Sequence, residues 1–211
     1  MSKVFGYGED ALTLWTLKRH TSRILEHPKF QDKTAPSDCI VFYRPSFGRS
    51  GGKKSAEFGE FDAILVSSEN AYLVESKWDN NAVYKKDEIT LDKEQLLRHQ
   101  ILSWYLTHWN KKHYHNWQNF AKEQEKDFQK EFKNKKRIAT KGLLAANLHF
   151  ILTKSTKHCK KLSADNIKNV LLFFHNAAKK SKPPKKTNKS FTLIPIDYSK
   201  EIDGNFIPLR M

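Results

Sequence analysis

Residues 59–78 read GEFDAILVSSENAYLVESKW, and this stretch decides the fold. Its two apolar runs, residues 63–66 and 71–74, are rich in the aliphatic, β-branched and aromatic residues that favour strands. A short polar turn of Ser, Glu and Asn separates the two runs. The stretch therefore predicts a β-hairpin centred between Ser68 and Glu69.

The register of this hairpin brings two acids together. With that centre, Asp62 lies opposite Glu75, and Glu60 lies opposite Lys77. Directly opposed residues of an antiparallel pair share one face and lie about 5 Å apart. The turn lacks the Asn-Gly pair that fixes a register, and a slip of one residue would put the two acids on opposite faces.

The acids and the lysine form a pattern typical of phosphodiester cleavage. Strand alternation puts Glu75 and Lys77 on one face. Carboxylates as close as Asp62 and Glu75 repel unless a cation lies between them, and hard divalent metals prefer carboxylate oxygens. Such a metal activates water and neutralises a phosphate, and a lysine stabilises the developing negative charge. The alternative is a salt-bridged surface hairpin in which Glu60 and Lys77 form an ordinary ion pair.

These residues resemble the PD-(D/E)XK nuclease superfamily, whose pattern is an acid early in one strand, a turn, and Glu-x-Lys late in the next. Phe61 stands where the namesake Pro would be, whereas GEFD at residues 59–62 is similar to the Gly-x-x-Asp of RecB-like members. The resemblance implies a restriction-endonuclease-like α/β fold. Such a fold has an αβββαβ core, in which helices flank a central mixed sheet.

The resemblance also implies roles for individual residues. Asp62 and Glu75 would ligate Mg²⁺, for which Mn²⁺ could substitute, with help from the Ser76 carbonyl. Lys77 would be catalytic. Superfamily members often bring a glutamate from the first helix to the metal, and Glu9 at the head of a predicted helix matches. The alternative for this acid is a first-turn position favoured by the helix dipole.

Further auxiliary candidates lie beside these residues. RecB-like members carry Gln-x-x-x-Tyr on the helix after Glu-x-Lys. Here Gln100 is followed by Trp104 and then Tyr105, so the match is off by one, and Gln95 is a second candidate. The alternative for both glutamines is plain helix surface. Glu60 is an auxiliary candidate because of its expected place opposite the lysine.

The order of predicted elements agrees with one nuclease domain over residues 1–211. We expect a helix over residues 10–27, a strand over 39–43, the hairpin, a helix over 92–109 and a strand over 148–152. After this core, we expect a helix from Ser163 to residue 179, a strand over 191–196 and a C-terminus packed back on the core. The core spans about residues 5–110 and 140–211, and residues 111–139 form a helical insertion. The alternative roles of the insertion are a DNA arm or a dimer element, so a homodimer stays open.

Composition indicates a polyanionic partner. The 211 residues include 38 Lys and Arg against 23 Asp and Glu, which gives a net charge of +15. The alternative is a lysine-rich protein from an AT-rich genome. Two loops, residues 46–54 and 179–189, carry basic residues that could contact DNA. The candidates for DNA contact are Arg49, Lys53, Lys54, Lys185 and Lys186.

The same composition argues against a membrane protein. The mean hydropathy is −0.71, and no run approaches the about 20 apolar residues that span a bilayer. The first residues lack the apolar core of a signal peptide, and we expect the two cysteines to be reduced thiols of a cytoplasmic protein.

Together these features predict a Mg²⁺-dependent DNA nuclease. Because no helicase or ATPase motif accompanies the domain, we expect an endonuclease of restriction or defence type rather than a processive exonuclease. One alternative is a non-catalytic basic DNA-binding protein whose acids are structural. Another is a DNA-processing exonuclease of the RecB-like or nuclease-related (NERD) kind.

Overall fold

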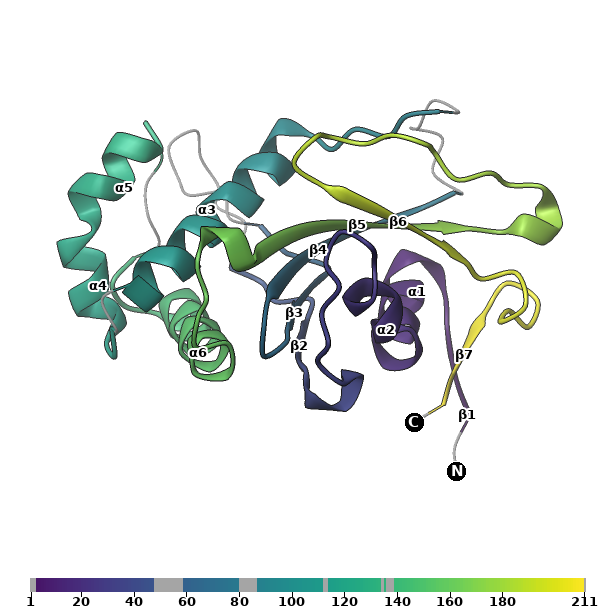
Figure 1. Ribbon diagram of the computed structural model, residues 1–211, viewed down its shortest axis with the longest axis horizontal. Helices are drawn as coiled ribbons and strands as arrows, with labels where there is room; N and C mark the ends of the chain where they lie inside the picture. The colour runs from purple at the N-terminus through teal and green to yellow at the C-terminus, as the bar shows by residue number, and fades with distance from the viewer. Residues whose placement is uncertain are drawn as a thin grey trace.

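A five-stranded mixed β-sheet forms the centre of the computed structural model, which describes residues 3–47, 59–79, 87–111, 114–133, 135 and 139–210 (Figure 1). In sheet order, the strands are β2 (Ile40–Tyr43), β3 (Ala63–Val66), β4 (Ala71–Trp78), β5 (Ile167–His175) and β6 (Thr192–Asp197). β3 is antiparallel to its neighbours β2 and β4, whereas β5 and β6 run parallel to β4. The chain therefore has an α/β fold with a mixed central sheet.

The predicted hairpin register is confirmed. Ala63 pairs with Val74 and Val66 with Ala71, which is the register that puts residues 62 and 75 opposite each other. Buried Asp32 ties down the turn, because its Oδ2 accepts hydrogen bonds from Ser67 Oγ, from Asn70 Nδ2 (2.9 Å) and from Tyr72 OH (2.8 Å). This network fixes the turn without an Asn-Gly pair.

Helices cover both faces of the sheet (Figure 1). On one face, α1 (Gly8–Arg19) and α2 (Thr21–Leu25) pack against residues such as Leu65 and Val74. On the other, α3 (Lys93–Lys111) and α6 (Leu143–His158) pack against residues such as Ile64 and Leu73. Since both faces are covered, β3 and most of β4 are buried throughout, which explains their continuous apolar runs.

Two short helices lie at one end of this assembly, α4 (Trp117–Glu123) and α5 (Glu125–Glu131). They attach to α3 through aromatic side chains. For example, the ring centroid of Phe128 lies 5.3 Å from that of Trp104 and 5.5 Å from that of Tyr105. Within the described residues, every helix is too short or too polar to cross a membrane.

The remaining elements connect the two ends of the chain. β1 (Lys3–Gly6) pairs with β7 (Ile207–Arg210) in a separate two-stranded sheet, and Ile207 joins the core on the α1 face. The C-terminal segment therefore packs back on the core, as expected. The 3₁₀ turns are η1 (Pro36–Asp38), η2 (Ala164–Asn166) and η3 (Ala177–Lys179).

Three predictions of secondary structure are wrong. Residues 148–152 belong to α6, because the buried residues Leu148, Ile151, Leu152 and Ser155 follow helical spacing while Phe150 points to solvent. The helix expected over residues 163–179 is instead η2, β5 and η3. β5 lies between β4 and β6 and is buried on both faces, so its apolar run shows no strand alternation. The single helix expected over residues 10–27 is divided into α1 and α2 at His20.

Candidate functional site

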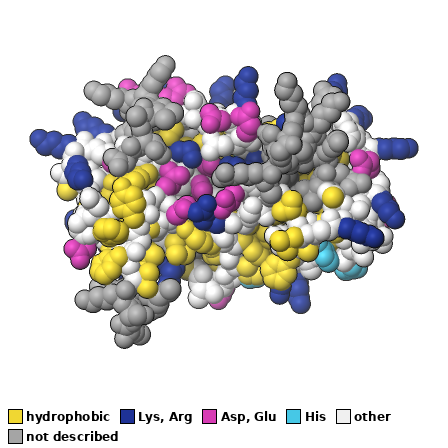
Figure 2. Space-filling view, turned by 180° about the vertical axis from the view of Figure 1, so that it is seen from behind, with side chains coloured by type: hydrophobic (Ala, Val, Ile, Leu, Met, Phe, Trp, Pro, Cys, Tyr) yellow, Lys and Arg dark blue, Asp and Glu magenta, His cyan; other side chains and the backbone are white. Residues whose placement is uncertain are grey.

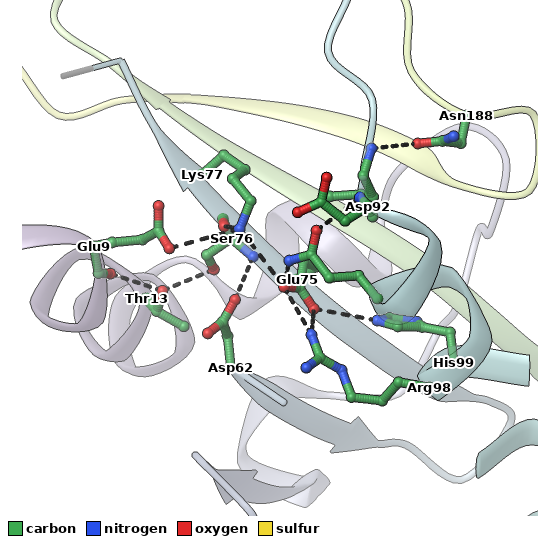
Figure 3. A network of polar contacts seen from close by, with 12 residues as sticks. Glu9, Thr13, Asp62, Glu75, Ser76, Lys77, Asp92, Arg98, His99 and Asn188 are labelled. Atoms are coloured by element: carbon green, nitrogen blue, oxygen red, sulfur yellow. Dashed lines mark hydrogen bonds and ion pairs between the residues drawn. The ribbon is translucent and has the colours of Figure 1, made fainter. Parts of the chain in front are cut away.

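Four parts of the chain meet at the end of the β3–β4 hairpin (Figure 3). The first turn of α1 supplies Glu9, the residue before β3 is Asp62, and the second half of β4 supplies Glu75 and Lys77. α3 lies over this end of the hairpin with Gln95 and two residues that the sequence did not single out. The predicted acids and lysine are therefore close together.

Glu75 is the most tightly held side chain of the site, with 4% of it exposed. Arg98 Nη2 donates to both of its carboxylate oxygens at 3.0 and 2.8 Å, and Gln95 Nε2 donates to Oε1. His99 Nε2 lies 3.4 Å from Oε2. Burial alone would raise the pKa of Glu75, but the His99 contact and the Arg98 and Lys77 charges lower that pKa to about 2. Glu75 is thus ionised at neutral pH.

Arg98 is itself fixed by its surroundings. Its guanidinium carbon lies 5.3 Å from the centroid of the Phe61 ring, a cation–π contact. Gly59, at φ +62°, leaves room for it, because a Cβ there would lie 2.8 Å from Arg98 Nη1. The GEFD segment therefore contributes to the site in two ways. Asp62 is one of its acids, and Gly59 and Phe61 position Arg98.

Asp62 differs electrostatically from Glu75. Its Oδ2 accepts a hydrogen bond from the backbone N–H of Ser76 at 2.6 Å. Burial and the nearby Glu75 charge raise the pKa of Asp62 to about 7, against the opposing effects of that hydrogen bond and Lys77. This acid therefore holds a proton near neutral pH in the absence of an added cation.

Lys77 lies between the acids. Its Nζ donates to the Ser76 carbonyl at 2.8 Å and lies 3.6 Å from Glu75 Oε1 and 3.9 Å from Glu9 Oε1. Glu60 was expected opposite this lysine. Instead, Glu60 lies outside the β3–β4 ladder and accepts a hydrogen bond from Arg44 Nε at 2.7 Å. Before Ala63, the chain stays bridged to the segment after β2, where Glu60 pairs with Ser46.

Glu9 has an unused oxygen. Its Oε2 is buried and has no hydrogen-bond partner among the described residues. Burial raises the pKa of Glu9, as does the Glu75 charge, while the Lys77 charge opposes the shift. Thr13 holds this end of α1 on β4, since its Oγ1 donates to the Glu9 carbonyl at 2.8 Å and lies 2.8 Å from Ser76 Oγ.

The other predicted residues lie elsewhere. Gln100 is exposed and lines a separate surface cavity of about 630 Å³ together with Trp104 and His108. Lys185 pairs with Asp87 at 3.2 Å, and both side chains are largely exposed. The Lys186 carbonyl accepts from the N–H of Ile89. Arg49, Lys53 and Lys54 lie outside the described residues.

Sequence reasoning missed Arg98, His99 and Thr13. A signal for the first two existed. Gln95, Arg98 and His99 are spaced i, i+3 and i+4, so their three polar side chains lie on one face of the helix, near its buried apolar residues. No comparable sequence signal marks Thr13.

The donor set suits a hard divalent cation, although the described residues contain no group of three or more Asp, Glu, His or Cys arranged as a ready metal cage. Within the part of the chain that the structure describes, the three carboxylates of Glu9, Asp62 and Glu75 face the two cations of Lys77 and Arg98. The unpartnered Glu9 Oε2 and the raised pKa of Asp62 both indicate missing positive charge. A bound cation would give Glu9 Oε2 a partner and would favour the ionised form of Asp62.

The outer surface carries the same mixture of charges. Figure 2 shows acidic and basic side chains together in the middle of one face, between hydrophobic side chains, with Lys and Arg also projecting around the edge. Comparisons of the chain with protein-family models, with curated proteins and with solved structures find no match.

Proposed function

We propose that the chain is a metal-dependent nuclease that hydrolyses phosphodiester bonds in DNA. The observation that carries this proposal is the hairpin register, which brings Asp62, Glu75 and Lys77 to one end of β3 and β4. With α2, α4, α5 and α6 left aside as additions, the order α1, β2, β3, β4, α3, β5 supports a restriction-endonuclease-like core, because it runs helix, an antiparallel three-stranded meander, helix and a parallel strand.

In this proposal, Asp62, Glu75 and Glu9 would hold Mg²⁺, with the Ser76 carbonyl as a further oxygen donor. The ion would supply activation of water and neutralisation of the scissile phosphate. Arg98 and Gln95 act as positioning residues, since they fix both oxygens of the Glu75 carboxylate. A cation that uses Glu75 must share this carboxylate with Arg98.

Lys77 has the freedom that a catalytic lysine needs. Its strongest contact is one backbone carbonyl, and its two carboxylate neighbours lie at 3.6 and 3.9 Å. Its ammonium can therefore turn toward a phosphate oxygen and stabilise negative charge there. Glu9 Oε2 has no hydrogen-bond partner among the described residues, so it would be available to the ion.

DNA is the proposed substrate because the chain carries a net charge of +15. An endonuclease of restriction or defence type is the preferred form. Covalently closed circular DNA separates it from an exonuclease, which needs an end to act on.

The test is cleavage of supercoiled circular DNA in Mg²⁺, in Mn²⁺ and in EDTA by the wild type and by Asp62→Asn. Glu94→Gln is the matched control, because Glu94 is an exposed acid on α3. We expect metal-dependent cleavage by the wild type and the control and none by Asp62→Asn. Equal cleavage by Asp62→Asn would remove the site, and cleavage of linear DNA alone would favour the exonuclease.

A non-catalytic DNA-binding protein is the second candidate. It is favoured by the saturated surroundings of Glu75, whose oxygens already meet Arg98, Gln95 and His99. In that case, the wild type would bind DNA, and its circular substrate would stay intact in every metal.

A further inference from the structure

An aromatic ledge lies at the end of β4 and the start of α1, next in sequence to residues of the candidate site. We define it by Tyr7, Trp78 and Phe206, of which Tyr7 is 58% and Phe206 48% exposed. The Tyr7 ring packs edge-on against Trp78 with 5.7 Å between centroids, and its centroid lies 5.8 Å from that of Phe206. Three aromatic rings thus form one partly open surface.

The ledge is rigid at its base. Trp78 Nε1 donates to Tyr198 OH at 2.7 Å, and Tyr198 OH donates to Asp79 Oδ1 at 3.0 Å. Asp79 Oδ2 in turn accepts the N–H of Asn176 at 3.0 Å. This chain of hydrogen bonds connects the ends of β4 and β5 and fixes the plane of the indole, so a flat ligand would meet a preformed surface.

The ledge is continuous with the site through the backbone. Trp78 directly follows Lys77 on β4, and Tyr7 is the residue before α1, whose first turn holds Glu9. A pocket of about 240 Å³ lies against the ledge and is lined by Tyr7, Trp78 and the exposed Lys179. Successive side chains of β4 point to opposite faces of the sheet, so Trp78 lies on the face that α1 covers and Lys77 on the face that α3 covers. A ligand strand that leaves the site on the α1 side, past Glu9, would meet the aromatic rings and a cation.

We propose that this ledge stacks unpaired nucleobases of the DNA strand that the site cleaves, so that the substrate is DNA with single-stranded nucleotides next to the scissile phosphate. The inference rests on the proposed nuclease function and names its substrate class. Every base has a π-face that stacks on an aromatic side chain without regard to sequence. Lys179 supplies the charge for the neighbouring phosphate. Bases inside an intact duplex have their faces covered by each other and cannot use the ledge.

The test is binding of a fluorescently labelled single-stranded oligodeoxynucleotide in EDTA, in an Asp62→Asn background that removes cleavage from the measurement. Tyr7→Ala and Phe206→Ala should each weaken binding by about fivefold to a hundredfold, the contribution of one stacked base. Tyr7→Trp should retain binding. Phe150→Ala is the control, because Phe150 is 56% exposed on α6 and belongs to another surface. Thermal melts confirm that each variant is folded.

An oligonucleotide of the same length with abasic sites separates bases from phosphates. It should bind the parent protein more weakly than the normal strand does, and Tyr7→Ala should cause no further loss. Three results would overturn the inference: ledge variants that bind like Phe150→Ala, equal losses for normal and abasic strands, or no binding of single strands at all. This test measures binding and not cleavage, so it is independent of the proposed nuclease activity. A protein without nuclease activity can still bind single strands through the ledge, and an active nuclease can show no binding through it.

Discussion

Replacement of Asp62 by Asn should stabilise the protein at alkaline pH. Burial and the Glu75 charge raise the pKa of Asp62 to about 7 from an ordinary value of 3.8. At about 1.4 kcal/mol for each pH unit, this difference sets an upper limit of about 4 kcal/mol on the cost of ionising Asp62 in the folded state. Because water reaches part of the carboxyl, we expect a gain of about 1–3 kcal/mol. Asn retains an oxygen that can accept the Ser76 N–H.

The sign of the effect depends on pH. Between pH 3.8 and 7, the folded state holds the proton more tightly than the unfolded state does, so wild-type stability falls as pH rises. Asp62→Asn does not titrate and lacks this loss. The variant and the wild type should therefore have equal free energies of unfolding near pH 3.8. The difference between them should grow as pH rises to 7 and stay constant above it.

The neighbouring acid should behave in the opposite way. The pKa of Glu75 is lowered to about 2 from 4.5, so its ionisation stabilises the fold above pH 4.5 and this contribution is lost as pH falls toward 2. Glu75→Gln leaves the Arg98 guanidinium, with its side chain 14% exposed, without a carboxylate. We expect a loss of about 3 kcal/mol at pH 8, typical of a buried pair that loses one partner.

Urea denaturation of both variants and the wild type in EDTA at a series of pH values measures these free energies of unfolding. The contrast between the variants is the informative quantity, since each removes one carboxylate from the same site. If Asp62→Asn is destabilised at pH 8, or if both variants change stability by the same amount, the electrostatic account of the site is wrong.

Four further predictions concern activity, metal and DNA. Lys77→Ala should lower single-turnover cleavage by about 10²–10³ yet keep its DNA affinity in Ca²⁺; equal losses in both would make it a phosphate contact. Gln95→Ala should lower cleavage by about tenfold through loss of a charged hydrogen bond, while the exposed Gln100→Ala on the same helix should not; matching rates would contradict the positioning role. A tenfold excess of Mg²⁺ over its Kd should stabilise the wild type by about 1.4 kcal/mol in thermal melts but not Asp62→Asn. Lys185→Gln with Lys186→Gln should reduce the log–log salt slope of binding by about 0.9 for each phosphate that the double variant no longer binds, and an unchanged slope would assign both lysines to solvent.

The hairpin could be predicted from sequence because local and tertiary preferences agree there. Its strands are apolar, its turn is polar, and a register error would have exposed one strand face. The acids at its end followed from that register, and so did the place of Lys77 beside Glu75. The α1 glutamate came from a resemblance, and Glu9 does lie within 3.9 Å of that lysine.

The parts that failed depend on tertiary burial. The run at residues 148–152 is equally compatible with a buried strand and a buried helix face, and only packing of α6 against α3 decides between them. β5 was mistaken for a helix because a strand covered on both faces loses its alternation. The spacing of Gln95, Arg98 and His99 marks a polar face on α3, but its contact with Glu75 joins two different elements and follows only from the tertiary fold.

The position of β5 in the sheet has a consequence for synthesis of the protein. β5 covers the second edge of β4, yet it begins at Ile167, about ninety residues after β4 ends at Trp78. At roughly 5–20 residues per second, a ribosome needs about 5–20 s to deliver it. For seconds in every round of translation, the backbone N–H and C=O groups along this edge of β4 therefore lack their β5 partners, although β4 carries the candidate site. That interval, rather than the life of the finished sheet, is when the chain is most exposed to edge-to-edge aggregation.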